Sequence, residues 1–151
     1  MDLSSLKDTK KLAEKISKII KVDDIIFLYG EIGVGKTTFV RFLINQLEVV
    51  NKINKSDILS PTFNIVYDYE IKKIKILHFD LYRLKKYKDI LELGMFENSE
   101  NNITIVEWPE LIEPKPQDRI DIFFEYSKFE SSRAVKIVGL GKWKDYKFNE
   151  I

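Results

Sequence analysis

The residues best suited to chemistry form one short glycine-rich run. Residues Gly30–Thr37 read GEIGVGKT and match the pattern G-x-x-x-x-G-K-[ST] at every specified position. Glycines let the backbone approach a ligand closely, so that successive N–H groups can surround phosphate oxygens. Lys36 supplies a positive charge to the β- and γ-phosphates, and the Thr37 hydroxyl can ligate Mg²⁺. The run therefore predicts a phosphate loop that holds a nucleoside triphosphate with Mg²⁺.

This loop lies between the two elements that it requires. The apolar residues 25–29 (IIFLY) predict a strand covered on both faces, as in a parallel sheet. Residues 36–48 predict a helix, and the positive end of its dipole favours phosphate. The alternative is a glycine-rich turn that matches by chance, with Lys36 exposed to solvent, but it does not explain this context. We expect nucleotide contacts from Glu31, Ile32, Gly33, Val34, Gly35, Lys36, Thr37 and Thr38.

Two acidic residues end apolar strand-like segments further along the chain. Asp80 follows ILHF, and Glu107 follows ITIV. A phosphate-loop enzyme needs a carboxylate near Mg²⁺, usually at the end of such a strand. One of these acids could hold the metal while the other orients the attacking water, and the residues alone do not assign the roles. Each could instead be a surface acid at a strand end.

Two further candidate residues lie between the loop and Asp80 in the sequence. Thr62, in the segment Ser60–Phe63 (SPTF), could sense the γ-phosphate as switch segments do, or could belong to an ordinary Ser-Pro turn. His78 alternates with Ile74 and Ile76 along one strand face. That pattern favours a histidine in the core or behind the site over a catalytic base.

One motif is a decoy. Asn54–Asp57 match N-K-x-D, which reads guanine in many GTPases. Here the motif precedes both candidate acids and does not follow an apolar strand. The GTPase motif D-x-x-G is also absent at Asp80, because the third residue after it is Arg83 rather than glycine. We therefore interpret it as a polar loop and favour ATP over GTP.

Composition limits the class of protein. The chain has 151 residues and a net charge of +1, with a hydrophobic fraction of 44%. These values predict one folded domain, 1–151, and exclude a disordered chain. The near-neutral charge argues against a broad nucleic-acid clamp and leaves a local basic patch open. The chain has no cysteine and one histidine, which excludes disulfides and a multi-histidine metal site. The start of the chain is polar and no apolar run is long enough to span a bilayer, so we expect a cytoplasmic protein without membrane contact.

The order of elements predicts an α/β fold. We expect a single P-loop NTPase-like domain with a mixed parallel and antiparallel central sheet flanked by helices. Residues 5–21 predict a helix with capping-box spacing at Ser5 and Asp8. Segments 63–70 and 73–80 are separated by only Ile71 and Lys72, so they could pair as a hairpin. The remaining elements are expected as strands at 63–70, 73–80, 103–107, 119–126 and 133–139, and a short helix at 86–93.

Four blocks taken together resemble the TsaE family, the small ATPases of the bacterial tRNA threonylcarbamoyladenosine pathway. In chain order they are Gly30–Thr38 (GEIGVGKTT), Ser60–Phe63 (SPTF), His78–Leu84 (HFDLYRL) and Val106–Glu110 (VEWPE), and Leu91–Met95 (LELGM) also fits. The phosphate loop alone is generic, whereas the combination is specific. The similarity covers roughly residues 5 to 140.

The resemblance implies a function that spacing cannot supply. Members bind ATP and Mg²⁺, hydrolyse ATP slowly when alone, and act with the TsaB–TsaD complex, which modifies the adenosine beside the tRNA anticodon. Hydrolysis resets that complex between cycles, and tRNA is reached through it. By resemblance, the metal ligands are Thr37 and Glu107, the catalytic residues are Asp80, Glu107 and Thr62, Trp108 neighbours the metal, and Thr9 and Arg133 are further nucleotide contacts.

Two other functions stay open on the residues alone. A small-molecule phosphotransferase would need an acceptor pocket and a lid rich in arginine. The chain has four arginines, scattered at positions 41, 83, 119 and 133. A non-catalytic module that uses ATP as a conformational ligand would not need both Asp80 and Glu107.

Overall fold

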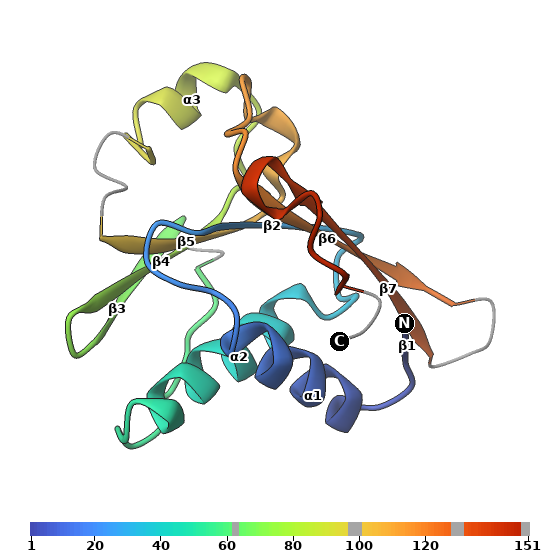
Figure 1. Cartoon of the computed structure of the whole chain (residues 1–151). Helices are drawn as coiled ribbons and strands as arrows, with labels where there is room; N and C mark the ends of the chain where they lie inside the picture. The colour runs from blue at the N-terminus through green and yellow to red at the C-terminus, as the bar shows by residue number, and fades with distance from the viewer. Residues whose placement is uncertain (62–63, 97–100, 128–131, 149–151) are drawn as a thin grey trace.

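A mixed seven-stranded sheet forms the centre of the computed structural model, which describes residues 1–61, 64–96, 101–127 and 132–148 (Figure 1). The strand order is β1-β7-β6-β2-β5-β4-β3. The strands are β1 (Asp2–Leu3), β2 (Ile25–Tyr29), β3 (Val66–Ile71), β4 (Ile74–Asp80), β5 (Asn102–Glu107), β6 (Arg119–Tyr126) and β7 (Arg133–Leu140). The helices are α1 (Leu6–Ser17), α2 (Lys36–Val50) and α3 (Tyr87–Leu91), with 3₁₀ turns at Pro109–Leu111 and Gly141–Trp143.

The middle of the sheet is parallel and its edges are antiparallel. Strand β2 pairs in parallel with β5 on one side and with β6 on the other, and β5 also pairs in parallel with β4. Strands β3, β7 and β1 add antiparallel pairs at the edges. The predicted mixed α/β fold is therefore confirmed.

Helices cover both faces of this sheet, and β2 shows why its sequence is apolar throughout. Ile26 and Leu28 pack in the cluster that includes α1 and α2, whereas Phe27 packs in the cluster that includes α3. Figure 1 shows α1 and α2 together on one side of the sheet and α3 on the other. A strand covered on both sides gains from apolar residues at every position.

Most element boundaries agree with the sequence to within a few residues. The capping box at the start of α1 is present, because the Ser5 side chain accepts from the Asp8 backbone and the Asp8 side chain accepts from Ser5. The helix ends at Ser17 rather than at residue 21. Ile20 is nevertheless buried, because the chain turns after the helix and keeps this side chain in the core.

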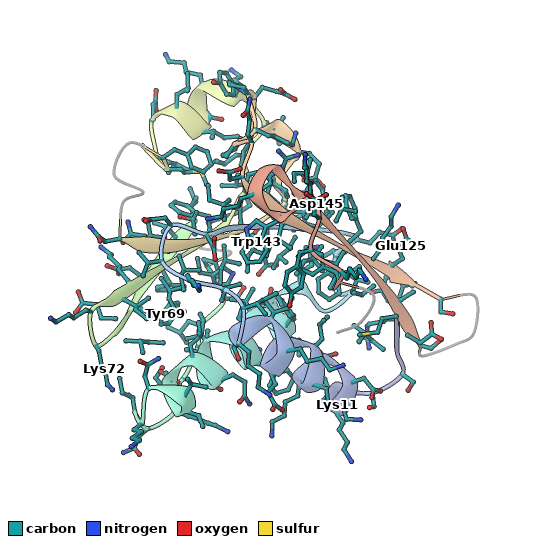
Figure 2. The ribbon with its side chains drawn as sticks, in the orientation of Figure 1. Lys11, Tyr69, Lys72, Glu125, Trp143 and Asp145 are labelled. Atoms are coloured by element: carbon teal, nitrogen blue, oxygen red, sulfur yellow. The ribbon has the colours of Figure 1, made fainter. Side chains whose placement is uncertain are left out.

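The hairpin of β3 and β4 is also confirmed, with Val66 opposite Phe79 and Ile71 opposite Ile74. Its first strand starts later than residue 63, because Ile65 adopts a positive φ of 66° that interrupts the extended backbone. The expected short helix at 86–93 is reduced to α3. Figure 2 shows side chains filling the space between sheet and helices, with Lys11 and Lys72 at the periphery.

Strand β1 was not predicted from the sequence. Two residues are too short to show any alternation, and their pairing is decided by β7, which places Asp2 opposite Ala134 and Leu3 opposite Arg133. In the described part of the chain, no helix is long and apolar enough to cross a membrane.

Candidate nucleotide site

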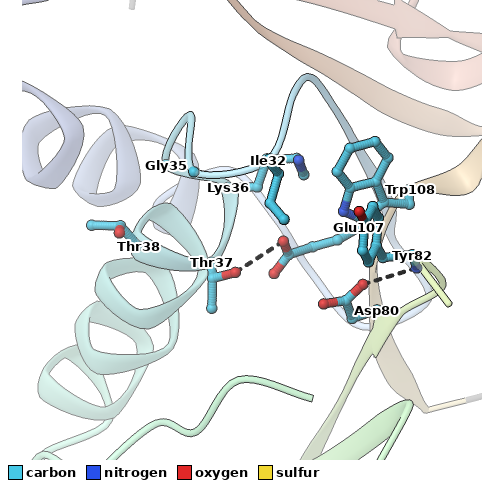
Figure 3. Close-up of a pocket in the computed structure, with 10 residues that line it drawn as sticks. Ile32, Gly35, Lys36, Thr37, Thr38, Asp80, Tyr82, Glu107 and Trp108 are labelled. Atoms are coloured by element: carbon cyan, nitrogen blue, oxygen red, sulfur yellow. Dashed lines mark hydrogen bonds between the residues drawn. The ribbon is translucent and has the colours of Figure 1, made fainter. Parts of the chain in front are cut away.

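The glycine-rich run forms the expected loop between β2 and α2. Gly33 and Gly35 have φ values of 75° and 117°, in the region that residues with a Cβ avoid. Gly35 is the N-cap of α2, so the loop leads directly into the helix N-terminus. A cavity of about 210 Å³ opens at this point (Figure 3). It is lined by Ile32, Gly33, Gly35, Lys36, Thr37, Thr38, Asp80, Tyr82, Glu107 and Trp108.

The two predicted acids reach this cavity because their strands are neighbours. Asp80 is the last residue of β4, Glu107 is the last residue of β5, and the two lie directly opposite each other in the parallel pair. Strand β5 also pairs with β2, where Leu28 is opposite Glu107 just before the loop. Carboxyl ends of adjacent parallel strands commonly form a ligand site at such an edge.

Glu107 is held by hydrogen bonds to both of its carboxylate oxygens. The Thr37 hydroxyl donates to Oε2 at 3.0 Å, and His78 Nε2 lies 2.9 Å from Oε1. Glu107 is 2% exposed and His78 is fully buried. The expectation that His78 lies in the core or behind the site, rather than acting as a base, agrees with this position.

Asp80 lies on the other side of the same space. Its Oδ1 accepts a hydrogen bond from the Tyr82 backbone N–H at 3.0 Å, and the side chain is largely buried. Figure 3 shows the carboxylates of Asp80 and Glu107 and the Thr37 hydroxyl facing one space, whereas Thr38 points away. The position suits an acid that binds water beside a ligand.

Lys36 folds back onto its own loop. Its Nζ donates to Gly30 O at 2.5 Å and to Glu31 O at 3.0 Å, and lies 3.9 Å from the centre of the Trp108 ring. Burial lowers the pKa of Lys36, while the negative charges of Glu107, Asp80 and Glu110 oppose that shift. At 4% exposure the side chain is not the solvent-exposed lysine of the alternative interpretation.

Trp108 and Tyr82 form an aromatic wall beside the lysine. Their ring centres are 4.9 Å apart. Trp108 has a φ of 59°, a left-handed conformation that costs of order 1–3 kcal/mol for a residue with a side chain. That backbone turn directly follows Glu107 and directs the indole over the ammonium group, so the strain is located at the site.

The far side of the loop is supported by a cross-strand pair, Tyr126 on β6 and Arg133 on β7. The Tyr126 hydroxyl donates to Ile32 O at 3.1 Å. A Cβ on Gly35 would lie 3.9 Å from the Arg133 side chain, whose buried Nε has no hydrogen-bond partner among the described residues. The structure thus places Arg133 beside the loop, and its contact with nucleotide stays a prediction. Tyr126 was missed, because a tyrosine near the end of a strand has no pattern that reveals a distant partner.

Other predicted residues take different positions. Val34 belongs to the loop, but its side chain is buried in the core. Thr9 is buried on α1 and is not among the residues that line the cavity. Thr62 lies outside the described residues. The N-K-x-D segment packs elsewhere, since Ser56 N donates to Glu48 Oε2 at 3.0 Å on α2, which agrees with a polar loop.

The donor atoms at this edge suit a hard divalent cation. Mg²⁺ prefers oxygen ligands and is often bound by one or two carboxylates together with substrate phosphates. The Thr37 hydroxyl and Glu107 Oε2 are two such oxygens within 3.0 Å of each other. Within the described ranges no group of three or more His, Cys, Asp or Glu residues could hold a metal alone. A cation here would therefore share its coordination with a phosphate ligand and water.

The fold and the loop together define a P-loop NTPase-like protein. A model of the family "Threonylcarbamoyl adenosine biosynthesis protein TsaE" matches residues 3–135. The chain therefore belongs to the TsaE family.

Curated relatives agree with this assignment, and each is named tRNA threonylcarbamoyladenosine biosynthesis protein TsaE. The Rickettsia conorii protein is 41% identical over 110 residues, which cover 73% of this chain and 61% of that relative. The Aquifex aeolicus protein is 39% identical over 136 residues, covering 89% and 92% of the two chains. The chain thus spans less than two thirds of the Rickettsia conorii relative and most of the Aquifex aeolicus one.

A solved structure supports the fold independently. The crystal structure of YdiB from Bacillus subtilis superimposes with a TM-score of 0.71 at 23% identity, covering 96% of this chain and 87% of YdiB. At that level of identity the similarity supports the architecture alone.

Proposed function

We propose that this chain binds ATP with Mg²⁺ and hydrolyses it slowly, as the ATPase subunit required for threonylcarbamoyl modification of the adenosine beside the tRNA anticodon. One observation carries the ATPase proposal. Thr37 is hydrogen-bonded to Glu107 in the same cavity that contains Lys36 and Asp80. The place in tRNA modification rests on membership of the TsaE family. Such a role implies a cytoplasmic location.

Each side chain has a distinct part in this proposal. Lys36 binds the β- and γ-phosphates, and Thr37 and Glu107 hold Mg²⁺. Asp80 orients the water that attacks the γ-phosphorus, so that the bond to the bridging oxygen breaks and ADP leaves. A Mg²⁺ ion held there would neutralise negative charge that develops on the phosphates. Thr9, Arg133 and Thr62 are proposed as further nucleotide contacts, with Thr62 near the γ-phosphate.

The position of Lys36 supports slow turnover by the chain alone. Its ammonium group is engaged by Gly30 O and Glu31 O and covered by Trp108. Phosphate must displace at least one of these interactions before the lysine can bind it. We propose that the TsaB–TsaD complex accelerates hydrolysis, that hydrolysis resets this complex between cycles, and that tRNA is reached through it.

The test is phosphate release from ATP, measured with the chain alone and then with TsaB and TsaD. We expect slow release that rises strongly with the partners and is lost in Lys36→Met. ATP binding without stimulation, together with transfer of labelled γ-phosphate to a metabolite, would instead establish a phosphotransferase. Absence of ATP binding would refute the proposal.

A further inference from the structure

His78 is a buried polar residue that no assigned role explains. It lies in β4, two residues before Asp80, and is fully buried. Its Nε2 lies 2.9 Å from Glu107 Oε1, and its Nδ1 has no hydrogen-bond partner in the described part of the chain. A carboxylate can only accept, so Nε2 is the donor and this bond is directed at Glu107.

A purely structural role does not account for this arrangement. Leaving one nitrogen of a buried imidazole without a partner is unfavourable. Ile76, two residues earlier on the same strand, shows that an aliphatic side chain fills the core at this depth. What an aliphatic residue cannot supply is a hydrogen-bond donor at Glu107 Oε1.

The two oxygens of Glu107 are thereby given different environments. Oε1 is bound by His78 from within the sheet, and Oε2 is bound by Thr37 on the cavity side. We propose that His78 is a positioning residue: by holding Oε1, it keeps Oε2 directed at Thr37, where the two oxygens can serve one Mg²⁺. This inference rests on the proposed function and names a residue that acts through Glu107 without touching nucleotide.

The expected effect follows from how such partners behave. Residues that hydrogen-bond a metal-ligating side chain typically alter metal affinity by about ten- to a hundredfold when removed. Without His78, the carboxylate loses the bond that fixes its rotation. Mg²⁺-dependent binding of ATP should weaken, whereas binding of ATP without metal should not.

Two matched variants separate positioning from packing. In His78→Gln, the terminal amide can donate from near the position of Nε2. In His78→Asn, the shorter side chain cannot reach Glu107, although it is equally polar. Ile76→Val is the control, because it alters buried packing on the same strand without contacting Glu107. For each protein, calorimetry gives the dissociation constant of ATP with Mg²⁺ and with EDTA, and thermal unfolding reports folding.

The measured quantity is the ratio of the ATP dissociation constant in EDTA to that with Mg²⁺. We expect this ratio to fall by about tenfold or more in His78→Asn. In His78→Gln and Ile76→Val it should stay within about threefold of wild type. Binding in EDTA should be unchanged in all of them. In a Glu107→Gln background, His78→Asn should add nothing further, because both changes act through one carboxylate.

Other outcomes would overturn the inference. Equal effects of His78→Asn with Mg²⁺ and with EDTA would show a structural role, as would additive losses with Glu107→Gln. A wild-type protein whose ATP affinity does not depend on Mg²⁺ would overturn the proposed metal site itself. Wild-type Mg²⁺ dependence that survives in His78→Asn would overturn the role of His78 alone.

Discussion

Replacing Lys36 with methionine tests the proposal that this residue binds phosphate. Methionine keeps the unbranched shape of the side chain but removes the ammonium group that contacts Gly30 O and Glu31 O. We expect ATP binding to weaken sharply while the protein stays folded. In the proposed function the lost charge is the one that binds phosphate, whereas removing a buried charge also removes its desolvation cost.

The magnitude follows from the contacts that Lys36 must exchange. A unit charge about 4 Å from a phosphate oxygen contributes about 4 kcal/mol at an effective dielectric of 20. An ammonium group has three donors, so Lys36 can reach phosphate by giving up one of its two charged hydrogen bonds to loop carbonyls, which costs about 1.5 kcal/mol of this. The remainder, about 2.5 kcal/mol, corresponds to a loss of roughly 70-fold in ATP affinity.

Calorimetric titration with ATP and Mg²⁺ measures this loss, and thermal unfolding measures stability. Lys11→Met is the control, because it removes the same charge from an exposed side chain that projects outward from α1 (Figure 2). It should bind ATP as wild type does. Affinity of Lys36→Met within about threefold of wild type would refute the assignment of Lys36 to phosphate. A protein that fails to fold would refute the view that the lysine is retained for binding rather than for stability.

Three further predictions concern the elements that support the site. Ser5→Ala removes the side-chain cap of α1 and should cost about 1 kcal/mol of unfolding free energy in urea titrations, with ATP affinity unchanged. Tyr126→Phe removes the hydrogen bond to Ile32 O and should weaken ATP binding by less than tenfold, because one neutral hydrogen bond contributes about 1 kcal/mol. Burial lowers the pKa of Lys36 in the folded, nucleotide-free chain, so the unfolded chain retains this proton over a range below pH 10.5 where the folded chain has lost it. Stability should therefore rise with pH across that range in wild type relative to Lys36→Met, and the opposite slope would contradict it.

The phosphate loop could be found from the sequence because its chemistry is local. Gly33, Gly35, Lys36 and Thr37 are consecutive or nearly so, and the loop conformation depends on glycine at set positions. The flanking strand and helix were also evident, because β2 is apolar throughout and α2 has helical periodicity. A segment with a clear hydrophobic pattern can be assigned as strand or helix without reference to the rest of the chain.

Other features had no local signal. Strand β1 has two residues, and its pairing depends on β7. Glu107 is hydrogen-bonded to Thr37, which is 70 positions away in the chain, and to His78, which is 29 positions away. The contact of Tyr126 with Ile32 spans 94 positions. None of these pairs can be derived from spacing, because each depends on which strands become neighbours.

By itself, then, the sequence determined the α/β class, the phosphate loop and the two acids that could serve it. The loop and each acid depend on residue types within one element and its neighbour in the sequence, and the class depends on the order of elements along the chain. The tertiary structure decided that β5 lies between β2 and β4, which brings Glu107 beside both Thr37 and Asp80. It also decided that His78 faces Glu107 and that Lys36 is covered by Trp108. Strand order and register are set by burial across the whole sheet, so no single segment encodes them.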